Sequence, residues 1–502
     1  MVGKILTTTT VGFDGRVIEV ECDATKGLPS LSIVGMGNKA IDEAKERVRS
    51  AINNSLLEFP AKKITINLAP AELRKDGTQF DLAIALAILV ISGQVRQTEV
   101  ANALFIGELA LDGSLRPVRG AIAAAETAKR AGLQMLYLPL ENASQACLIE
   151  EVKVIGVRSL KELFLHLKKE SRLEPALPTP PSATVQPQPH PVIDDVYGQE
   201  QAKRALLIAA AGRHNILLTG PPGSGKTMLA RVVNNLTPDL TIDEQITVTK
   251  LHSLVGETNE TIVTSRPFRA PHHTSSSVAL IGGGNIPRPG EISLAHLGIL
   301  FLDEMPEYPR SVLETLRQPL EDKHITINRA NGSFRYPADF MLVATMNPCP
   351  CGFFGDPKKE CSCTSTQILL YQKRLSGPLM DRIDMIITVP RVAQSDLLQE
   401  NSESFVQHNT YKKCIQDTMI VQNNRYKRSG KYNANLTSHE ARKLPIAPAA
   451  KQLLIQATTK LDISTRGYFR LLKVAQTIAD LAGSRQIEPP HIAEALQYRQ
   501  TS

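Results

Sequence analysis

Short apolar runs alternate with longer segments of helical spacing in the second half of the chain. Asn215–Thr219, Ile299–Leu302 and Phe340–Thr345 have the length and composition of buried strands. Helical patterns lie between these runs and dominate residues 448–498. Strands that alternate with helices are typical of a parallel sheet with helices on both faces. The pattern therefore predicts an α/β fold followed by a helical region.

Before residue 173 the pattern is mixed. Val17–Cys22 and Lys63–Leu68 alternate like strands, and Ala40–Asn53 repeats apolar side chains at helical spacing. Phe80–Ile91 has the pattern of a buried helix, and Ala121–Ala131 that of an alanine-rich helix. These elements predict a separate α+β domain at the N-terminus.

Prolines separate the two regions. Residues 174–191 hold seven prolines and show no apolar periodicity, so we expect a stiff, extended linker there. We also expect Gly467 and Pro489–Pro490 to interrupt the helices near the C-terminus. The predicted parts are a head at 1–172, a linker at 173–191, a core at 192–395 and a helical domain at 396–502.

Composition narrows the class of protein. A formal net charge of +7 permits an anionic partner such as nucleic acid without requiring one. The absence of Trp and an aromatic content of only 5% argue against a broad base-stacking surface. The longest apolar run, Leu82–Ile91, is too short to cross a bilayer, and Lys4 is followed by threonines rather than by the apolar core of a signal peptide. We therefore expect a cytoplasmic protein without a membrane segment.

A glycine-rich loop follows the first strand-like run of the core. It fits G-x-x-x-x-G-K-[ST], the phosphate-binding loop of nucleotide hydrolases. Its glycines let backbone N–H groups face the phosphates, its lysine contacts the β- and γ-phosphates, and its threonine hydroxyl can ligate Mg²⁺. A strand enters the loop and a helix leaves it, which disfavours a chance glycine-rich turn. The predicted nucleotide ligands are Gly220, Pro221, Pro222, Gly223, Ser224, Gly225, Lys226 and Thr227.

Polar side chains end the next two strand-like runs. Asp303 and Glu304 follow Ile299–Leu302; we expect Asp303 beside the metal and Glu304 where it polarises the attacking water. Asn347 follows the next run and resembles the sensor 1 residue of AAA+ ATPases. Together with the loop, these residues predict an ATP-hydrolysing site in which Thr227 and Asp303 hold Mg²⁺.

Three arginines are candidates for further positive charge at this site. Arg382 lies between acidic residues near the end of the core, and we expect it to be an arginine finger that reaches the γ-phosphate of a neighbouring subunit. The alternatives are a surface salt bridge for Arg382 and a finger at Arg374 instead. Arg466, at the start of a helix in the helical domain, resembles the sensor 2 residue that closes a lid on the nucleotide.

These motifs together resemble the magnesium-chelatase-like branch of AAA+ ATPases. The most specific stretch is Pro267–Ser276 (PFRAPHHTSS), accompanied by Gly282–Gly284 and Pro289–His296 (PGEISLAH). The resemblance covers essentially the whole chain. It implies an AAA+ P-loop domain with a parallel sheet and a helical lid, assembly into homo-hexamers, and ATP-driven branch migration of DNA during homologous recombination of incoming strands.

In proteins of this kind, an insert before the acidic strand and a hairpin before the sensor residue line a central pore. The resemblance places the insert at residues 256–295 and the hairpin at residues 325–339. Its tip has Asn-Gly turn chemistry, and Arg329 and Arg335 are predicted contacts to DNA phosphates. A solvated hairpin with ordinary surface arginines is the alternative.

The head resembles the proteolytic domain of Lon, which the recombination protein RadA also carries. The resemblance rests on residues 73–82 (LRKDGTQFDL) and 107–118 (GELALDGSLRPV). Lon uses a Ser–Lys dyad, but the motifs place Gln79 at the Ser position and Ile122 at the Lys position, so we expect no peptidase activity. The head is left with a role in assembly or DNA contact. Four of its cations fit a solvated face better than a DNA contact: Lys62, Lys63, Arg74 and Lys75.

Four of the seven cysteines are clustered as C-x-C-x₉-C-x-C. Four thiolates in one loop can surround a tetrahedral Zn²⁺, although zinc ribbons favour the wider C-x₂-C spacing. Reduced thiols without metal and an iron–sulfur cluster stay open as alternatives. The predicted zinc ligands are Cys349, Cys351, Cys361 and Cys363.

Two functions fit this set of residues: a motor that acts on DNA, and a chelatase-type ATPase that remodels a protein partner without DNA. A nucleotide-dependent assembly module that does not hydrolyse ATP is disfavoured, because Lys226, Asp303, Glu304 and Asn347 are all present. The Lon-like head favours the DNA motor, by analogy with RadA alone.

Overall fold

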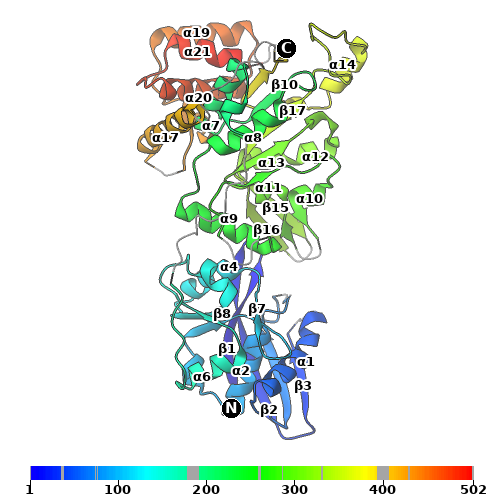
Figure 1. The fold of residues 1–502 in the computed structure, drawn as a ribbon, viewed down its shortest axis with the longest axis vertical. Coiled ribbons are helices and arrows are strands. Elements are labelled where there is room, and N and C mark those ends of the chain that lie inside the picture. Colours follow the sequence, from blue (N-terminus) through cyan, green and yellow to red (C-terminus); the bar gives the residue numbers. More distant parts are fainter. Residues whose placement is uncertain are drawn as a thin grey trace.

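The computed structural model describes residues 2–35, 39–73, 75, 77–177, 191–257, 262–284, 287–329, 332–392, 406–427 and 430–499. The molecule is elongated, with the head at one end and the core and helical domain at the other (Figure 1). Most of the predicted linker and the first residues of the predicted helical domain lie outside the described residues.

The head contains a single large mixed sheet and confirms the five elements predicted for it. Its elements are β1 (Gly3–Val11), β2 (Asp14–Thr25), β3 (Ser30–Val34), α1 (Lys39–Asn54), β4 (Lys63–Ala69), α2 (Asp81–Ile91), α3 (Gln97–Val100), β5 (Ala103–Phe105), β6 (Glu108–Leu109), β7 (Leu115–Arg116), α4 (Ala121–Arg130), β8 (Met135–Pro139), η1 (Leu140–Asn142), α5 (Ala143–Ala146), β9 (Lys153–Val157) and α6 (Leu160–Leu167).

Helices cover both faces of the head sheet, whose strand order is β3-β4-β2-β1-β5-β8-β9. The β1–β2 and β2–β4 pairs are antiparallel and the other pairs are parallel. One apolar core forms between the sheet and α1, α2 and α6, and a second between the sheet and α4 and α5. The helix α2 is buried along nearly its whole length, which explains its continuous apolar sequence.

One of the four head cations is not on the surface. Lys75 has no exposed side-chain area, its Nζ donates to the carbonyl of Pro70, and burial lowers its pKa. Neither a DNA contact nor a solvated face is therefore correct for Lys75. Lys62 and Lys63 are exposed as expected, and Arg74 lies outside the described residues.

The core is built on a five-stranded sheet with the order β11-β14-β17-β10-β18, in which every pair is parallel, as predicted. Its elements are η2 (Ile193–Asp195), α7 (Glu200–Gly212), β10 (Ile216–Thr219), α8 (Lys226–Leu236), α9 (Ile242–Val255), β11 (Phe268–Arg269), α10 (Ser277–Ile281), β12 (Gly282–Gly283), β13 (Arg288–Pro289), α11 (Glu291–Leu294), β14 (Ile299–Leu302), η3 (Met305–Glu307), α12 (Arg310–Thr315), α13 (Arg317–Asp322), β15 (His324–Arg329), β16 (Gly332–Pro337), β17 (Met341–Met346), α14 (Ser365–Gln372), α15 (Gly377–Met380) and β18 (Met385–Thr388).

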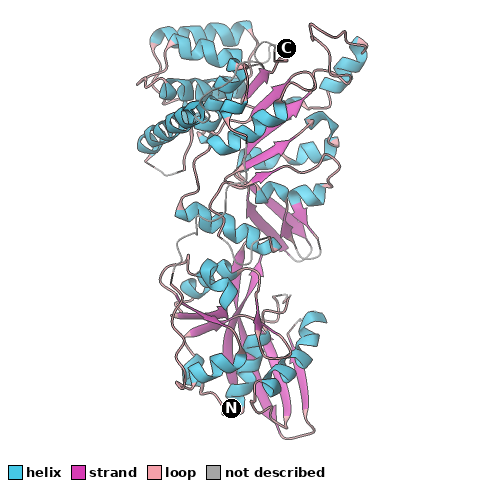
Figure 2. Cartoon of the chain, viewed as in Figure 1, coloured by secondary structure: helices cyan, strands magenta, loops and turns pink. Residues whose placement is uncertain are grey.

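Alternate residues of the core strands face different apolar clusters. Ile216 and Leu218 of β10 pack with α7 and α8, whereas Leu217 packs on the opposite side with α12 and α13. The helices of the C-terminal region lie beside the core sheet and its helices (Figure 2). Their apolar side chains join the first of these clusters, so they share a hydrophobic core with the sheet. They are α17 (Val406–Tyr426), η4 (Asn433–Asn435), α18 (Ser438–Ala441), α19 (Pro448–Lys460), α20 (Thr465–Leu481) and α21 (Pro489–Gln497).

The expected interruptions near the C-terminus are partly wrong. Gly467 lies inside the first turn of α20, where its N–H donates to the side chain of the capping residue Ser464. A Cβ on Gly467 would lie 2.6 Å from a side-chain carbon of Ile463, so close packing rather than a break requires glycine here. Pro489 begins α21, the position at which proline suits a helix best.

The head contacts the core through a buried lysine. Lys250 of α9 has a side chain only 2% exposed, and its Nζ lies 2.5 Å from Glu126 and 3.4 Å from Asp14, both in the head. The same ammonium lies 3.9 Å from the centroid of the Phe13 ring. A buried charge is tolerated because it is paired. The contact fixes the β1–β2 turn and α4 of the head against the core.

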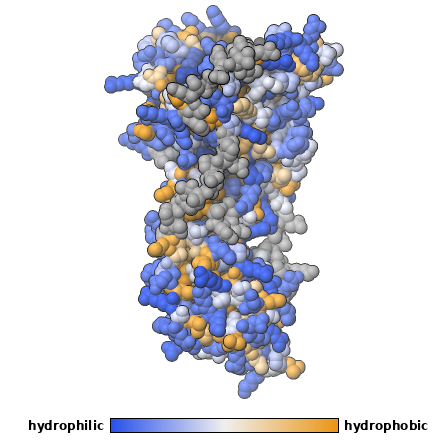
Figure 3. Space-filling model, viewed as in Figure 1, coloured by the Kyte–Doolittle hydropathy of each residue, from blue (hydrophilic) through white to orange (hydrophobic). Residues whose placement is uncertain are grey.

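Figure 3 shows one face of the molecule on which hydrophilic side chains dominate and apolar ones are scattered. Within the ranges that the structure describes, no helix combines the length and apolar character needed to cross a bilayer.

Candidate nucleotide-hydrolysis site

The predicted phosphate loop joins β10 to α8 at the carboxyl end of the core sheet. Backbone shape requires its glycines. A Cβ on Gly220 would lie 2.2 Å from the carbonyl oxygen of Val389, and Gly223 and Gly225 have φ angles of +77° and +83°. A loop of this kind, at the start of a helix, presents backbone N–H groups to an anion.

Lys226 is folded into the loop. Its Nζ donates to the carbonyl oxygens of Gly220 and Pro221, both at 2.8 Å, and to Oδ1 of Asn347 at 3.2 Å. Burial lowers the pKa of Lys226, while the nearby carboxylates of Asp303 and Glu304 act in the opposite direction. The structure therefore brings the predicted lysine and the predicted sensor residue into direct contact.

Thr345 lies on β17, the strand that ends just before Asn347, and it connects Asp303 and Glu304 to that strand. Thr345 was not among the site residues predicted from the sequence. The buried Thr345 hydroxyl donates to Oδ1 of Asp303 at 2.6 Å and accepts the backbone N–H of Glu304 at 2.9 Å. Glu304 has a φ of +49°, which non-glycine residues seldom adopt. Thr345 thus holds the turn that directs Glu304 away from β14. In the sequence, only the position of Thr345 two residues before Asn347 pointed to this role.

Thr227 and Asp303 have the chemistry of a magnesium pair. The Thr227 hydroxyl donates to Oδ2 of Asp303 at 3.3 Å. Mg²⁺ prefers oxygen ligands in an octahedron with bonds of about 2.1 Å, whose neighbouring corners lie about 3 Å apart. A small adjustment of these two oxygens would accommodate the ion, so the predicted pair fits it.

Gln199 is a second residue that the sequence analysis missed. It has a φ of +57° just before α7, and its Nε2 donates to the carbonyls of Ser224 at 2.8 Å and Pro390 at 3.2 Å. It connects the phosphate loop to the chain that leaves β18. Nothing in the sequence marked it.

Arg382 and Arg466 lie at the opposite edge of the sheet from the phosphate loop. Arg382 precedes β18, and its carbonyl accepts from Asn215, which precedes β10. Both arginines face one carboxylate: Nη2 of Arg382 lies 2.7 Å from Oε1 of Glu321, and Nη2 of Arg466 lies 3.6 Å from the same oxygen. Because parallel strands have their amino ends at one edge, neither arginine is beside the loop of its own chain.

The two finger candidates differ in exposure. The Arg382 side chain is 7% exposed and also donates to the carbonyls of Arg317 and Pro378, so a role as a finger requires it to leave these partners. Arg374 is 53% exposed and pairs with Glu307 beside an open cavity of about 600 Å³. The salt bridge weighed for Arg382 is present, and the choice between the fingers stays a prediction.

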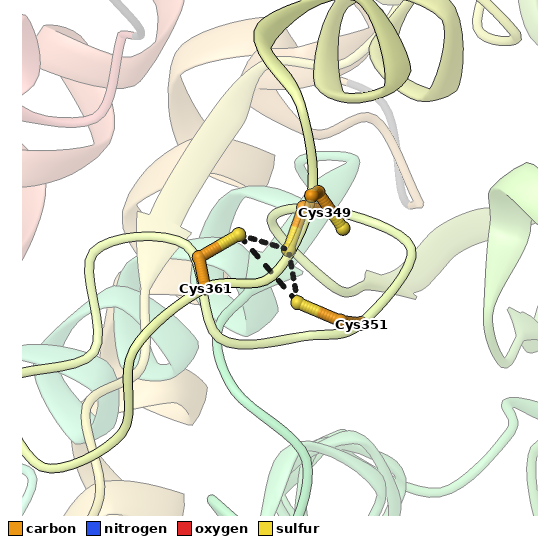
Figure 4. A group of neighbouring side chains, drawn as sticks. Cys349, Cys351 and Cys361 are labelled. Carbon is orange, nitrogen blue, oxygen red and sulfur yellow. Dashed lines mark hydrogen bonds between the residues drawn. The ribbon is translucent and has the colours of Figure 1, made fainter.

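The cysteine cluster is compact and lies directly after the sensor residue. The sulfurs of Cys349, Cys351 and Cys361 lie 3.3 to 3.6 Å from one another (Figure 4), and all four Sγ atoms, including that of Cys363, lie within 4.8 Å. These distances exceed the 2.05 Å of a disulfide. A tetrahedral Zn²⁺ with bonds of about 2.3 Å separates its sulfurs by about 3.8 Å. The four thiols therefore fit the metal.

His296, from the motif PGEISLAH, has a structural role. Its Nδ1 accepts the backbone N–H of Asp339 at 2.9 Å, which links the chain before β14 to the chain before β17. Burial lowers the pKa of His296 to about 4. The unprotonated ring is needed for this hydrogen bond.

Acidification is expected to destabilise the core through His296. The unfolded residue titrates near 6.5, so the unfolded state binds more protons between about pH 6.5 and 4, and up to about 3 kcal/mol of unfolding free energy is lost across that window. Denaturant unfolding at several pH values should show His296→Asn with a flatter pH dependence, and His439→Gln, at an exposed histidine, with an unchanged one. Equal slopes for His296→Asn and the unsubstituted protein would contradict the assignment.

The predicted pore hairpin is present as β15 and β16, with its tip, residues 330–331, outside the described ranges. Arg329 and Arg335 are both exposed but project from opposite faces. Arg335 contacts His324 on one face, and the guanidinium of Arg329 lies beside Gly283 of the insert on the other. The hairpin thus offers two cationic positions rather than one patch.

Comparison with known proteins agrees with this architecture. The family models for magnesium chelatase subunit ChlI match residues 192–397, 20–142 and, for its C-terminal part, 407–499. The chain belongs to the magnesium-chelatase-like AAA+ ATPases, in the branch that contains ComM and YifB. It is 42% identical to the competence protein ComM of Haemophilus influenzae, over 99% of this chain and 97% of the relative.

Two other relatives are similar over nearly their full length. YifB of Escherichia coli is 42% identical over 98% of this chain and 96% of its own. The Mycobacterium tuberculosis protein Rv2897c is 38% identical over 99% of both chains. By contrast, a magnesium-chelatase 67 kDa subunit of Chlorobaculum parvum is 26% identical over only 31% of this chain.

Proposed function

We propose that this protein hydrolyses ATP as a ring of identical subunits, a homo-hexamer, and acts as a DNA motor in the cytoplasm. Its activity would be branch migration, with helicase character, in homologous recombination during natural transformation. The main support for the proposal is that the residues predicted to act in hydrolysis lie at two opposite edges of the core sheet. Asp303, Glu304 and Asn347 surround the loop at one edge of the sheet, and Arg382 and Arg466 lie at the other.

This split favours sites shared between subunits. A chain that presents its phosphate loop on one side and Arg382 and Arg466 on the other can complete a neighbour's site by a head-to-tail contact, in which these arginines leave Glu321. Such heterologous contacts close into rings when the rotation allows. In that arrangement Arg382 is the finger, and Arg466 binds the nucleotide held by the adjacent copy. Arg374, which pairs with Glu307 on the turn after β14 and so lies near the edge of the phosphate loop, is the alternative finger.

Three observations support DNA as the substrate. The relative with 42% identity over nearly the full chain is named a competence protein. The hairpin presents Arg329 and Arg335 to solvent, and the net charge of +7 suits a polyanion.

The second candidate, a chelatase-type ATPase that remodels a protein partner without DNA, is favoured by the family to which the core domain belongs.

The other two parts have supporting roles in the proposal. The head is a Lon-like domain without a peptidase dyad, since Gln79 and Ile122 stand where the Ser and Lys would be. It serves assembly or DNA contact. The four-cysteine cluster holds a structural Zn²⁺.

ATP turnover of the full chain, measured at low salt with no DNA, with single-stranded DNA and with a branched junction, tests the proposal. We expect stimulation by DNA and, by electron microscopy with ATP, six-membered rings. Turnover that DNA leaves unchanged, together with no binding of either DNA, would favour the protein-remodelling function. A monomer at all nucleotide concentrations would contradict the shared site.

Replacing both hairpin arginines is expected to weaken DNA binding without changing the ATP turnover measured in the absence of DNA. Arg329→Ala/Arg335→Ala should lower DNA affinity and reduce the slope of log affinity against log salt by about 2, because two phosphate contacts are lost. Basal turnover should not change. The matched control is Lys62→Ala/Lys63→Ala, which removes the same charge from exposed head positions. An unchanged salt slope in the hairpin variant would show that the hairpin is a solvated surface that does not contact DNA phosphates.

A further inference from the structure

The loop that carries the cysteines packs against the phosphate loop. Gly352 is buried with a φ of +85°, and a Cβ added to it would lie 2.7 Å from Cδ and 3.1 Å from Cγ of Pro222. The same Cβ position is 3.9 Å from the side-chain amide carbon of Asn347. Gly352 thus packs against the nucleotide loop close to the sensor residue, although neither motif predicts such a contact.

A second contact ties the cysteine loop to the chain that leaves β18. Phe353 lies under the guanidinium of Arg391 at 5.5 Å, and Arg391 pairs with Asp356 at 3.1 Å. Arg391 is two residues beyond Val389, whose carbonyl oxygen closes on Gly220. The cysteine loop is therefore anchored to the phosphate loop at Pro222 and to the segment after β18 that also packs on Gly220.

The cysteine loop has no secondary structure and few buried side chains of its own to hold this conformation. Residues 347–364 form neither helix nor strand. Most of its side chains are at least partly exposed, and Phe354 is 50% exposed. An ordered stretch of this length without secondary structure is uncommon. A metal held by the four convergent sulfurs would crosslink it.

We infer that a Zn²⁺ held by the four cysteines is the support of the phosphate loop, so that metal occupancy sets the affinity for ATP. With the metal bound, Cys349 fixes the direction of the chain from Asn347, which holds Lys226, and Gly352 holds Pro222. Without it, both supports relax while the sheet stays folded. The inference rests on the ATP site proposed above and adds a requirement for metal to it.

Metal content and ATP affinity, measured on the same samples, test this inference. The full chain, purified without chelators, should contain about one zinc per chain by elemental analysis, the stoichiometry of a four-thiolate site. Removal with a zinc-selective chelator should weaken binding of a fluorescent ATP analogue at least about tenfold, and added Zn²⁺, but not Mg²⁺, should restore it. Protein with no zinc, iron in its place, or unchanged affinity after zinc removal would each overturn it. Failure of the untreated, zinc-loaded protein to bind the analogue would instead refute the ATP site itself.

Two glycine variants test the contact between the cysteine loop and the phosphate loop independently of metal binding. Gly352→Ala should keep its zinc yet bind the analogue at least about tenfold more weakly, because the new Cβ displaces Pro222. Gly355→Ala is the matched control: its φ of +77° gives similar backbone strain, but no atom lies within 4 Å of the added Cβ. It should match the unsubstituted protein. Equal affinity in Gly352→Ala and Gly355→Ala, with zinc and circular dichroism intact in both, would show that the two loops are not coupled.

Discussion

Glu304→Gln is expected to lower ATP turnover about a hundredfold to ten-thousandfold while ATP still binds, which is the range for loss of a general base. Glu304 is exposed at the end of β14 and is directed by the hydrogen bond from its N–H to Thr345. The amide keeps the size of the side chain but cannot take a proton from water. ATP should therefore accumulate on the protein and stabilise the assembled ring.

Single-turnover hydrolysis and binding of a fluorescent ATP analogue measure the two effects separately. Glu307→Gln is the control for the turn, since Glu307 is exposed there and its carboxylate pairs with Arg374 and not with Lys226 or Asp303. Full turnover in Glu304→Gln would refute its role. Equal losses in both variants would point to damage to the turn itself.

Mixing two inactive variants is expected to restore activity if the site is shared. Lys226→Ala removes the phosphate contact of its own loop, and Arg382→Ala removes the finger offered to a neighbour, a loss of about a thousandfold or more. In a random one-to-one mixture, about a quarter of the interfaces of a head-to-tail ring pair an intact loop with an intact finger. Turnover of the mixture should exceed that of either variant by a corresponding amount.

The same experiment decides between the two finger candidates. If Arg374 is the finger, Arg374→Ala in place of Arg382→Ala gives the recovery. Arg382 is buried against Glu321, so thermal melting of each variant must show that the loss is not unfolding. No recovery in either mixture, with rings still formed, would contradict a finger at these positions.

The sequence could predict which polar residues the structure brings together around the candidate nucleotide site, because they lie at strand ends within short motifs. The spacing of Gly220–Thr227, the carboxylates after β14 and the amide after β17 each follow a buried apolar run. In a parallel sheet, runs of this kind must end at one edge, which brings the polar residues together. The four cysteines converge for an equally local reason, since a single loop carries them all.

Burial and long-range contacts could not be predicted in this way. Lys75 stands in a polar stretch but is fully buried, and Gly467 looks like a break but lies within a helix. Lys250 is a lone lysine in sequence, yet two carboxylates and an aromatic ring of the head surround it. In each case the deciding partner comes from another element, whose position depends on how the whole chain packs.

By itself, the sequence determined which residues are candidates for this chemistry: a predicted phosphate loop, a predicted metal-binding carboxylate, a candidate base, a candidate sensor amide and a four-cysteine cluster. Only the tertiary structure decided how these parts are connected. Thr345 joins the two carboxylates to the sensor strand, Gly352 sets the cysteine loop against Pro222, and Arg382 and Arg466 meet at the far edge of the sheet. The physical reason is that periodicity and spacing fix local structure, whereas strand order and side-chain packing fix which distant residues touch.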